Sequence, residues 1–146
     1  MEKVRTTKEF NFEMAHALHG YDGLCANGHG HSCWLWVTDR GGVKKENKLF
    51  KDGIVMDFTD LKSLVKPIII KKEDHSLVFN TKSPHLNLDL SVFDKVYYLR
   101  YQLTSKNLVS DFANFINSLL PENVELFKVL LSETATSFAE WNSKDN

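Results

Sequence analysis

The sequence Lys8-Glu9-Phe10-Asn11-Phe12-Glu13-Met14-Ala15-His16 sets the architecture expected for this chain. From Phe10 onward, every second side chain is apolar or an imidazole, which is typical of a β-strand with one buried face. Residues 31–40 repeat this alternation. One face of this second stretch carries His31, Cys33, Leu35 and Val37. A loop that contains four glycines separates the two stretches, and we expect two neighbouring strands.

Shorter patterns predict the other extended segments. A short strand is expected within residues 49–57, around Ile54-Val55-Met56. Residues 95–102 are rich in aromatic side chains and are expected to be extended. A last strand is predicted over residues 124–133.

Two helices are predicted between these strands. The first begins at an N-cap, Asp57 or Thr59, and the second begins at Thr104 or Ser105. Pro67 lies inside the apolar pattern of the first helix and should kink or split it, because proline lacks the backbone N–H that a helix needs. Strands grouped around two helices indicate an α+β fold, with an antiparallel sheet and the helices on one face.

The composition narrows the class of protein. The 146 residues fit a single domain, 1–146, and 42% hydrophobic with 25% charged residues exclude wholesale disorder. The net charge of −1 gives no reason to expect a nucleic acid or membrane partner, and no apolar stretch approaches the ~20 residues of a membrane span. Two cysteines and a charged start without a secretory signal favour the cytoplasm. Residues 142–146 are predicted to fray.

The stretch Cys25-Ala26-Asn27-Gly28-His29-Gly30-His31 contains candidate metal-binding and catalytic residues. His29 and His31 are two residues apart, so in an extended chain both imidazoles point to the same side. His16 ends the neighbouring strand and can complete a set of three. Three nitrogen ligands without a thiolate suit Zn²⁺ with its fourth position open, the pattern of catalytic zinc. The alternative is a histidine-rich loop that binds no metal.

The two cysteines have different expected roles. Cys25 is a fourth zinc ligand, a nucleophile, a base or an unreactive thiol, and the proximity of zinc and imidazoles favours a reactive thiolate. Cys33 lies within a strand pattern and is expected in the core. His19 and His85 lie in predicted loops, and we expect both at the surface.

Two acidic positions remain open to two interpretations each. Asp74-His75 follows the first helix, and a carboxylate that orients an imidazole makes it a better proton carrier. Neighbouring residues of a strand face opposite ways, so a direct pair needs a turn; the alternative is a solvated loop. Glu133 ends an apolar strand face, where it could accept two N–H donors from a flat heterocycle. Alternatively, the strand has already ended and Glu133 is solvated.

Taken together, these motifs resemble the family of 6-pyruvoyl-tetrahydropterin and 6-carboxytetrahydropterin synthases. Besides the Cys25 to His31 run, the matching stretches are Phe12-Glu13-Met14-Ala15-His16, Gly53-Ile54-Val55-Met56-Asp57-Phe58, Asp74-His75-Ser76-Leu77 and Glu133-Thr134-Ala135-Thr136-Ser137-Phe138-Ala139. The resemblance implies the tunnelling fold, an antiparallel four-stranded sheet with two helices on one face. It also implies assembly into a barrel, as a homohexamer (a dimer of trimers) with active sites between subunits.

The resemblance also implies a role for each matching residue. His16, His29 and His31 would bind the catalytic Zn²⁺. Cys25 would be the base that moves protons on the substrate side chain, and Asp74 with His75 would form a second acid/base unit. Glu133, Thr104 and Thr134 would contact the pterin triphosphate substrate, with Glu133 as the anchor of the pterin ring.

Three functions are compatible with this resemblance. The favoured one is a zinc-dependent lyase that eliminates triphosphate from 7,8-dihydroneopterin triphosphate, of the 6-carboxy-5,6,7,8-tetrahydropterin synthase type. That type releases acetaldehyde and feeds the synthesis of queuosine and other 7-deazapurines. The second is 6-pyruvoyl-tetrahydropterin synthase, of the tetrahydrobiopterin pathway. The third is a zinc- or pterin-binding protein without turnover, which Lys106, where the family often has Glu, and the long segment 81–101 would favour.

Overall fold

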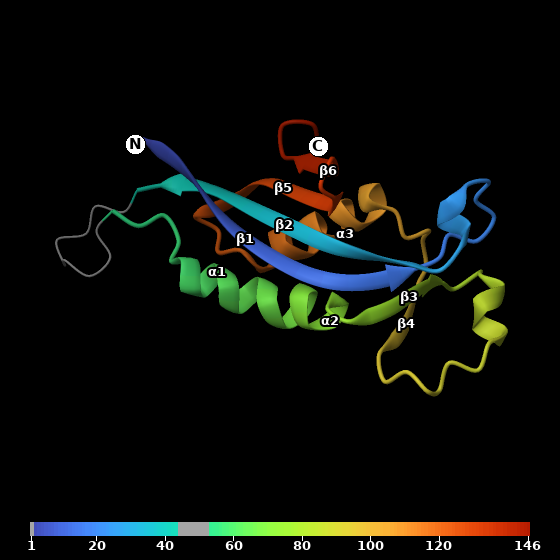
Figure 1. Ribbon diagram of the computed structural model, residues 1–146. Helices are drawn as coiled ribbons and strands as arrows, with labels where there is room; N and C mark the ends of the chain where they lie inside the picture. The colour runs from blue at the N-terminus through green and yellow to red at the C-terminus, as the bar shows by residue number, and fades with distance from the viewer. Residues whose placement is uncertain (1, 44–52) are drawn as a thin grey trace.

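A computed structural model describes residues 2–43 and 53–146 (Figure 1). Two long strands, β1 (Lys3–His16) and β2 (His29–Gly42), form an antiparallel pair at the centre of the sheet. They pair from Lys3 opposite Gly42 to His16 opposite His29. Both predicted strands are confirmed, and the pairing brings two of the predicted ligands together at one end of the sheet.

The sheet has six strands in the order β4-β3-β1-β2-β5-β6. β5 (Val124–Thr134) and β6 (Ser137–Asn142) continue the antiparallel arrangement beyond β2. β3 (Ser76–Asn80) and β4 (Val96–Leu99) extend the other side, and β1, β3 and β4 run parallel. The expectation of four antiparallel strands is therefore wrong. β3 and β4 are too short to show a clear alternation, and partners distant in the sequence stabilise them.

The first helix is interrupted where the proline predicts it. α1 (Phe58–Val65) begins at Asp57, whose carboxylate accepts a hydrogen bond from the Thr59 N–H at 2.7 Å. It continues as a π-helical segment, η2 (Lys66–Ile70), and ends as a short turn, α2 (Lys71–Glu73). The wider π-turn accommodates the missing N–H of Pro67. Within the described ranges, no helix is long and apolar enough to cross a membrane.

α3 (Ser105–Leu119) lies with α1 on one face of the sheet (Figure 1). The Thr104 side chain caps it, as expected, by accepting the Asn107 N–H at 3.3 Å. Side chains from both helices and the sheet form one core. Its members include Phe10, Phe12, Cys33, Leu35, Leu61, Val65, Leu108, Phe112, Ile116, Val129 and Leu131. Cys33 is buried, as expected.

The loop before α1 differs from expectation. Residues 49–52 of the predicted third strand lie outside the described residues, and residues 53–57 form a turn and bends instead of a strand. Gly53 adopts φ +83°, which an extended strand does not tolerate.

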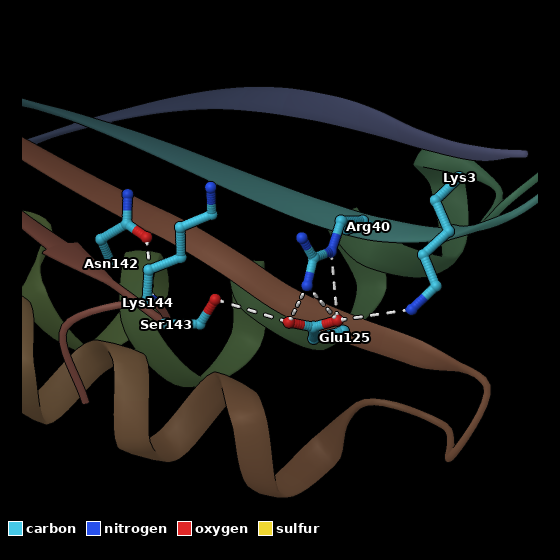
Figure 2. Close-up of polar contacts among 6 residues, drawn as sticks. All are labelled: Lys3, Arg40, Glu125, Asn142, Ser143 and Lys144. Carbon is cyan, nitrogen blue, oxygen red and sulfur yellow. Dashed lines mark hydrogen bonds and ion pairs between the residues drawn. The ribbon is translucent and has the colours of Figure 1, made fainter.

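The C-terminal segment folds back onto β5 at the end of the sheet remote from His16. Figure 2 shows Glu125 between Arg40 and Ser143, with Arg40 Nη2 2.6 Å from Glu125 Oε1. The Ser143 N–H donates to the Phe127 carbonyl at 3.0 Å. The predicted fraying is therefore wrong for the start of the tail, because its backbone is hydrogen-bonded to β5.

Candidate active site

Three imidazoles converge at one end of the central strand pair. Nε2 of His16 lies 3.0 Å from Nε2 of His29 and 2.9 Å from Nε2 of His31. The antiparallel register places His16 opposite His29, and the period of two along β2 brings His31 to the same face. Among the described residues, these three form a cluster whose ligand atoms all lie within 4.8 Å of one another. The predicted set of ligands is thus assembled within one chain.

The cluster has the geometry and the ionisation of a metal site. Nitrogens on a tetrahedral Zn²⁺, each about 2.0–2.1 Å from the ion, stand about 3.3 Å apart, close to the observed separations. Nδ1 of His29 lies 2.7 Å from the Asn27 carbonyl oxygen, so Nδ1–H donates and the Nε2 lone pair is left for a metal. Burial, and then the charges of His29 and His31, lower the pKa of His16 to about 4. His16 is therefore neutral, as a metal ligand must be.

Nδ1 of His16 supports the same conclusion. It is buried and has no hydrogen-bond partner of standard geometry in the described part of the chain. The backbone of Leu103 lies beside the His16 ring and favours its protonated form. A metal on Nε2 would keep the proton on Nδ1, which is turned away from the other two imidazoles.

Asp74 and His75 form a direct pair because the backbone turns between α2 and β3. His75 has φ +57°, and its Nδ1 lies 3.1 Å from Asp74 Oδ1. Asp74 Oδ1 also accepts the Glu13 N–H at 2.9 Å. This bond, followed by His75 and the charge of Lys95, lowers the pKa of Asp74. Asp74 is therefore an anion that orients Nδ1–H. Nε2 of the exposed His75 ring has no hydrogen-bond partner among the described residues and can exchange a proton.

One cavity joins the histidine cluster to this pair. His31 and His75 both line it, and its volume is ≈ 860 Å³. The other lining residues are Glu13, Met14, Ala15, Gly30, Ser32, Ser76, Leu77, Phe93, Asp94 and Lys95. β1 lies between the two histidines, because Met14 is opposite both His31 and Ser76.

Cys25 lies apart from the cluster of nitrogens. It is half-buried in a short turn, η1 (Leu24–Ala26), and its carbonyl accepts the Leu18 N–H at 2.9 Å. Among the described residues, its sulfur is not a member of the metal-ligating group. The structure therefore gives no support to Cys25 as a fourth ligand.

Glu133 and Thr134 lie at the end of β5. Glu133 follows Ser132, the partner of Trp34. Burial of the Cys33 thiol, and then the charge of Glu133, raise the pKa of Cys33 to about 12. Glu133 is half-buried and lines a hollow of ≈ 540 Å³ together with Thr134 and Trp34. Glu133 is therefore neither fully buried nor fully solvated, so neither of the two interpretations from the sequence holds completely.

The chain order places Thr104 close to the histidine cluster, because it follows Leu103, the backbone neighbour of His16. Its hydroxyl is engaged as the cap of α3. Lys106 is exposed in the first turn of α3. The capping bond leaves the Thr104 hydroxyl proton available to another acceptor.

Sequence reasoning missed two residues and misplaced a third. Asn27 orients His29, and its position two residues before a ligand is a signal that could have been used. Lys95 contacts the backbone of Asp74, and no local pattern indicates this. His85, expected at the surface, is half-buried and stacks on Phe79 with ring centroids 4.7 Å apart. His19 is exposed, as expected.

Comparisons with known proteins identify the family of this chain. The family described as 6-pyruvoyl tetrahydropterin synthase matches residues 5–144. The 6-carboxy-5,6,7,8-tetrahydropterin synthase of Haemophilus influenzae is 33% identical over 139 residues, covering 94% of this chain and 97% of that protein. The 6-pyruvoyl tetrahydrobiopterin synthase of Drosophila melanogaster is 26% identical over 133 residues, covering 71% of this chain and 76% of that protein. The structure of Caenorhabditis elegans 6-pyruvoyl tetrahydropterin synthase shares the fold, with TM-score 0.71 and 24% identity over 98% of this chain and 97% of that chain. Because the match spans nearly the whole sequence, this chain belongs to the 6-pyruvoyl tetrahydropterin synthase family.

Proposed function

We propose that this chain is a zinc-dependent 6-carboxy-5,6,7,8-tetrahydropterin synthase, a lyase that acts on 7,8-dihydroneopterin triphosphate and eliminates triphosphate. The observation that carries the proposal is that Nε2 of His29 and Nε2 of His31 lie 3.0 and 2.9 Å from Nε2 of His16, next to an oriented Asp74–His75 pair. The name of the Haemophilus influenzae relative supports the carboxy product over the pyruvoyl product.

The residues of the chain divide the chemistry between them. A zinc ion held by His16, His29 and His31 would supply Lewis acidity to the substrate oxygens and stabilise negative charge there. Cys25 serves as the base that takes a proton from the substrate side chain. His75, held in orientation by Asp74 at 3.1 Å, accepts or delivers a proton through its Nε2.

Glu133, Thr104 and Thr134 would hold the substrate. The half-buried Glu133 carboxylate can accept two N–H donors from the edge of a pterin ring, a bidentate arrangement that fixes the ring orientation. Thr134 lines the same hollow, and Thr104 lies next to the residue that neighbours His16. The ring would thus be fixed at one end, with its side chain directed to the imidazoles.

Assembly into a homohexamer with sites between subunits is part of the proposal. β3 pairs only with Met14 to His16 of β1, so most of the outer edge of β1 has no strand partner within the described residues. β6 forms the opposite edge of the sheet. Two such edges allow copies of the chain to join their sheets into a barrel. We also expect the protein in the cytoplasm, where the free thiols of Cys25 and Cys33 would stay reduced.

The decisive experiment is an anaerobic incubation of zinc-loaded protein with 7,8-dihydroneopterin triphosphate, followed by mass spectrometry. Acetaldehyde together with a 6-carboxy pterin is the expected result. A 6-pyruvoyl pterin would instead assign the activity of the 6-pyruvoyl synthases, the second candidate, which the Drosophila melanogaster relative favours. If zinc is bound and no product forms, the protein binds zinc or pterin without turnover. Metal-free protein serves as the control and should release neither product.

A further inference from the structure

Lys95 connects the segment after β3 to the turn that carries His75. The chain leaves β3, passes through η3 (Pro84–Asn87) and returns as β4, which pairs in parallel with β3. Lys95 stands immediately before β4, and its carbonyl accepts the Leu77 N–H at 3.0 Å. Its backbone is therefore fixed beside the start of β3.

The ammonium group of Lys95 binds the end of the first helix. Nζ donates to the Lys71 carbonyl at 2.5 Å and also to the Asp74 carbonyl. Carbonyls in the last turn of a helix lack intrahelical partners and carry a partial negative charge, so a cation there is stabilising. Lys95 is half-buried, which limits the competition from water for these bonds.

The Asp74–His75 turn needs such support. A residue other than glycine at φ +57° is in a region that costs about 1 kcal/mol or more, and it persists only where neighbouring contacts impose it. On one side, the His75 N–H donates to the Glu13 carbonyl at 2.6 Å, and Asp74 Oδ1 accepts the Glu13 N–H at 2.9 Å. On the other side, Lys95 holds the Asp74 carbonyl. The turn is thus fixed between β1 and Lys95.

We propose that Lys95 is a positioning residue for the acid/base pair: its ammonium group fixes the Asp74–His75 turn and thereby the imidazole in the cavity that it shares with His31. This inference rests on the function proposed for the pair. Lys95 itself, with Phe93 and Asp94, forms one wall of that cavity. Loss of the ammonium group should leave the zinc ligands in place and should misplace the His75 ring.

Lys95→Met is the test, because methionine keeps a similar chain length and loses the charge and all three donors. Lys71→Met is the matched control, since it removes a neighbouring cation and leaves its backbone carbonyl in place. We expect the kcat of K95M to fall about tenfold to a hundredfold, the range seen when a residue that orients a catalytic group is removed and the group is displaced. The KM and the zinc content of K95M should stay at the wild-type level. The kcat of K71M should also stay at the wild-type level. Amide hydrogen exchange at His75 should be faster in K95M and unchanged in K71M.

Three results would overturn the proposal. One is a wild-type kcat in K95M; another is an equal loss in K95M and K71M, which would indicate a general charge effect. The third is an unchanged exchange rate at His75 in K95M. That measurement needs no substrate, so it decides the positioning role even if wild-type protein fails to turn over 7,8-dihydroneopterin triphosphate and the proposed function is wrong. If K95M does not fold, Lys95→Gln, which keeps a donor, should show an intermediate loss of kcat, and no loss would refute the role.

Discussion

Glu73 at the end of α2 should make the stability of this protein fall as the pH rises. Its side chain is 2% exposed, accepts a hydrogen bond from the Tyr97 hydroxyl, and lies 3.9 Å from Lys72 Nζ. Burial raises the pKa of Glu73 from 4.5 to about 7, and the charge of Lys72 opposes this only in part. The carboxyl group is therefore protonated in the folded protein under conditions in which it is ionised in the unfolded chain.

The sign and size of the effect follow from linkage. Between pH 4.5 and about 7, the folded state binds a proton that the unfolded state has released, so the free energy of unfolding decreases as the pH rises through this window. At ~1.4 kcal/mol per unit of pKa, the shift corresponds to about 3 kcal/mol. Glu73→Gln keeps an oxygen acceptor for Tyr97 and cannot ionise. The free energy of unfolding of E73Q minus that of wild type should therefore increase by about 3 kcal/mol as the pH is raised from 4.5 to 8.

The assay is urea unfolding of both proteins across this pH range, at one protein concentration and one zinc concentration. The difference between the two curves isolates Glu73, because all other titratable groups are the same in both proteins. Glu122→Gln, at an exposed position, is the control and should follow the wild-type curve. Parallel curves for wild type and E73Q would refute the reasoning, since they would mean that Glu73 keeps an ordinary pKa in the fold.

Three further predictions concern the site and its frame. His31→Ala should lower the bound zinc measured by plasma mass spectrometry, because it removes one of three convergent nitrogens, whereas His19→Ala should not; full zinc content in H31A would disprove the assigned ligand. Cys25→Ala should abolish product formation and keep zinc, and a loss of zinc would instead make Cys25 a ligand. Thr104→Ala removes the acceptor of the Asn107 N–H and should lower the free energy of unfolding by about 1 kcal/mol. An unchanged free energy of unfolding in T104A would show that this cap does not stabilise α3.

Local sequence patterns are sufficient to predict those helices and strands that are specified mainly by neighbouring residues. The alternation in residues 8–16 and 31–40 predicts β1 and β2, because one-sided burial requires apolar side chains at every second position. The caps Asp57 and Thr104 predict the starts of both helices, because each side chain binds a backbone N–H within its own first turn. Pro67 predicts the interruption for an equally local reason.

β3 has no comparable local pattern. The aromatic-rich residues 95–102 correctly predict the extended segment of β4, but they do not indicate which strand it pairs with. Each is short, and each exists because its backbone pairs with a strand that is distant in the sequence or across a long loop. The contact of Lys95 with Asp74, 21 residues away, has the same origin. Such pairings depend on the geometry of the whole sheet, which a window of neighbouring residues does not contain.

The site divides in the same way. His29 and His31 belong together on the basis of spacing alone, because a period of two is a property of any extended chain. The antiparallel register adds His16, and the orientation of His29 depends on the carbonyl of Asn27. For Asp74 and His75, the neighbouring sequence by itself favoured a solvated loop over a direct pair. The tertiary structure decides for the pair, because bonds from Glu13 and Lys95 hold His75 at a positive φ that the local chain would not adopt by itself.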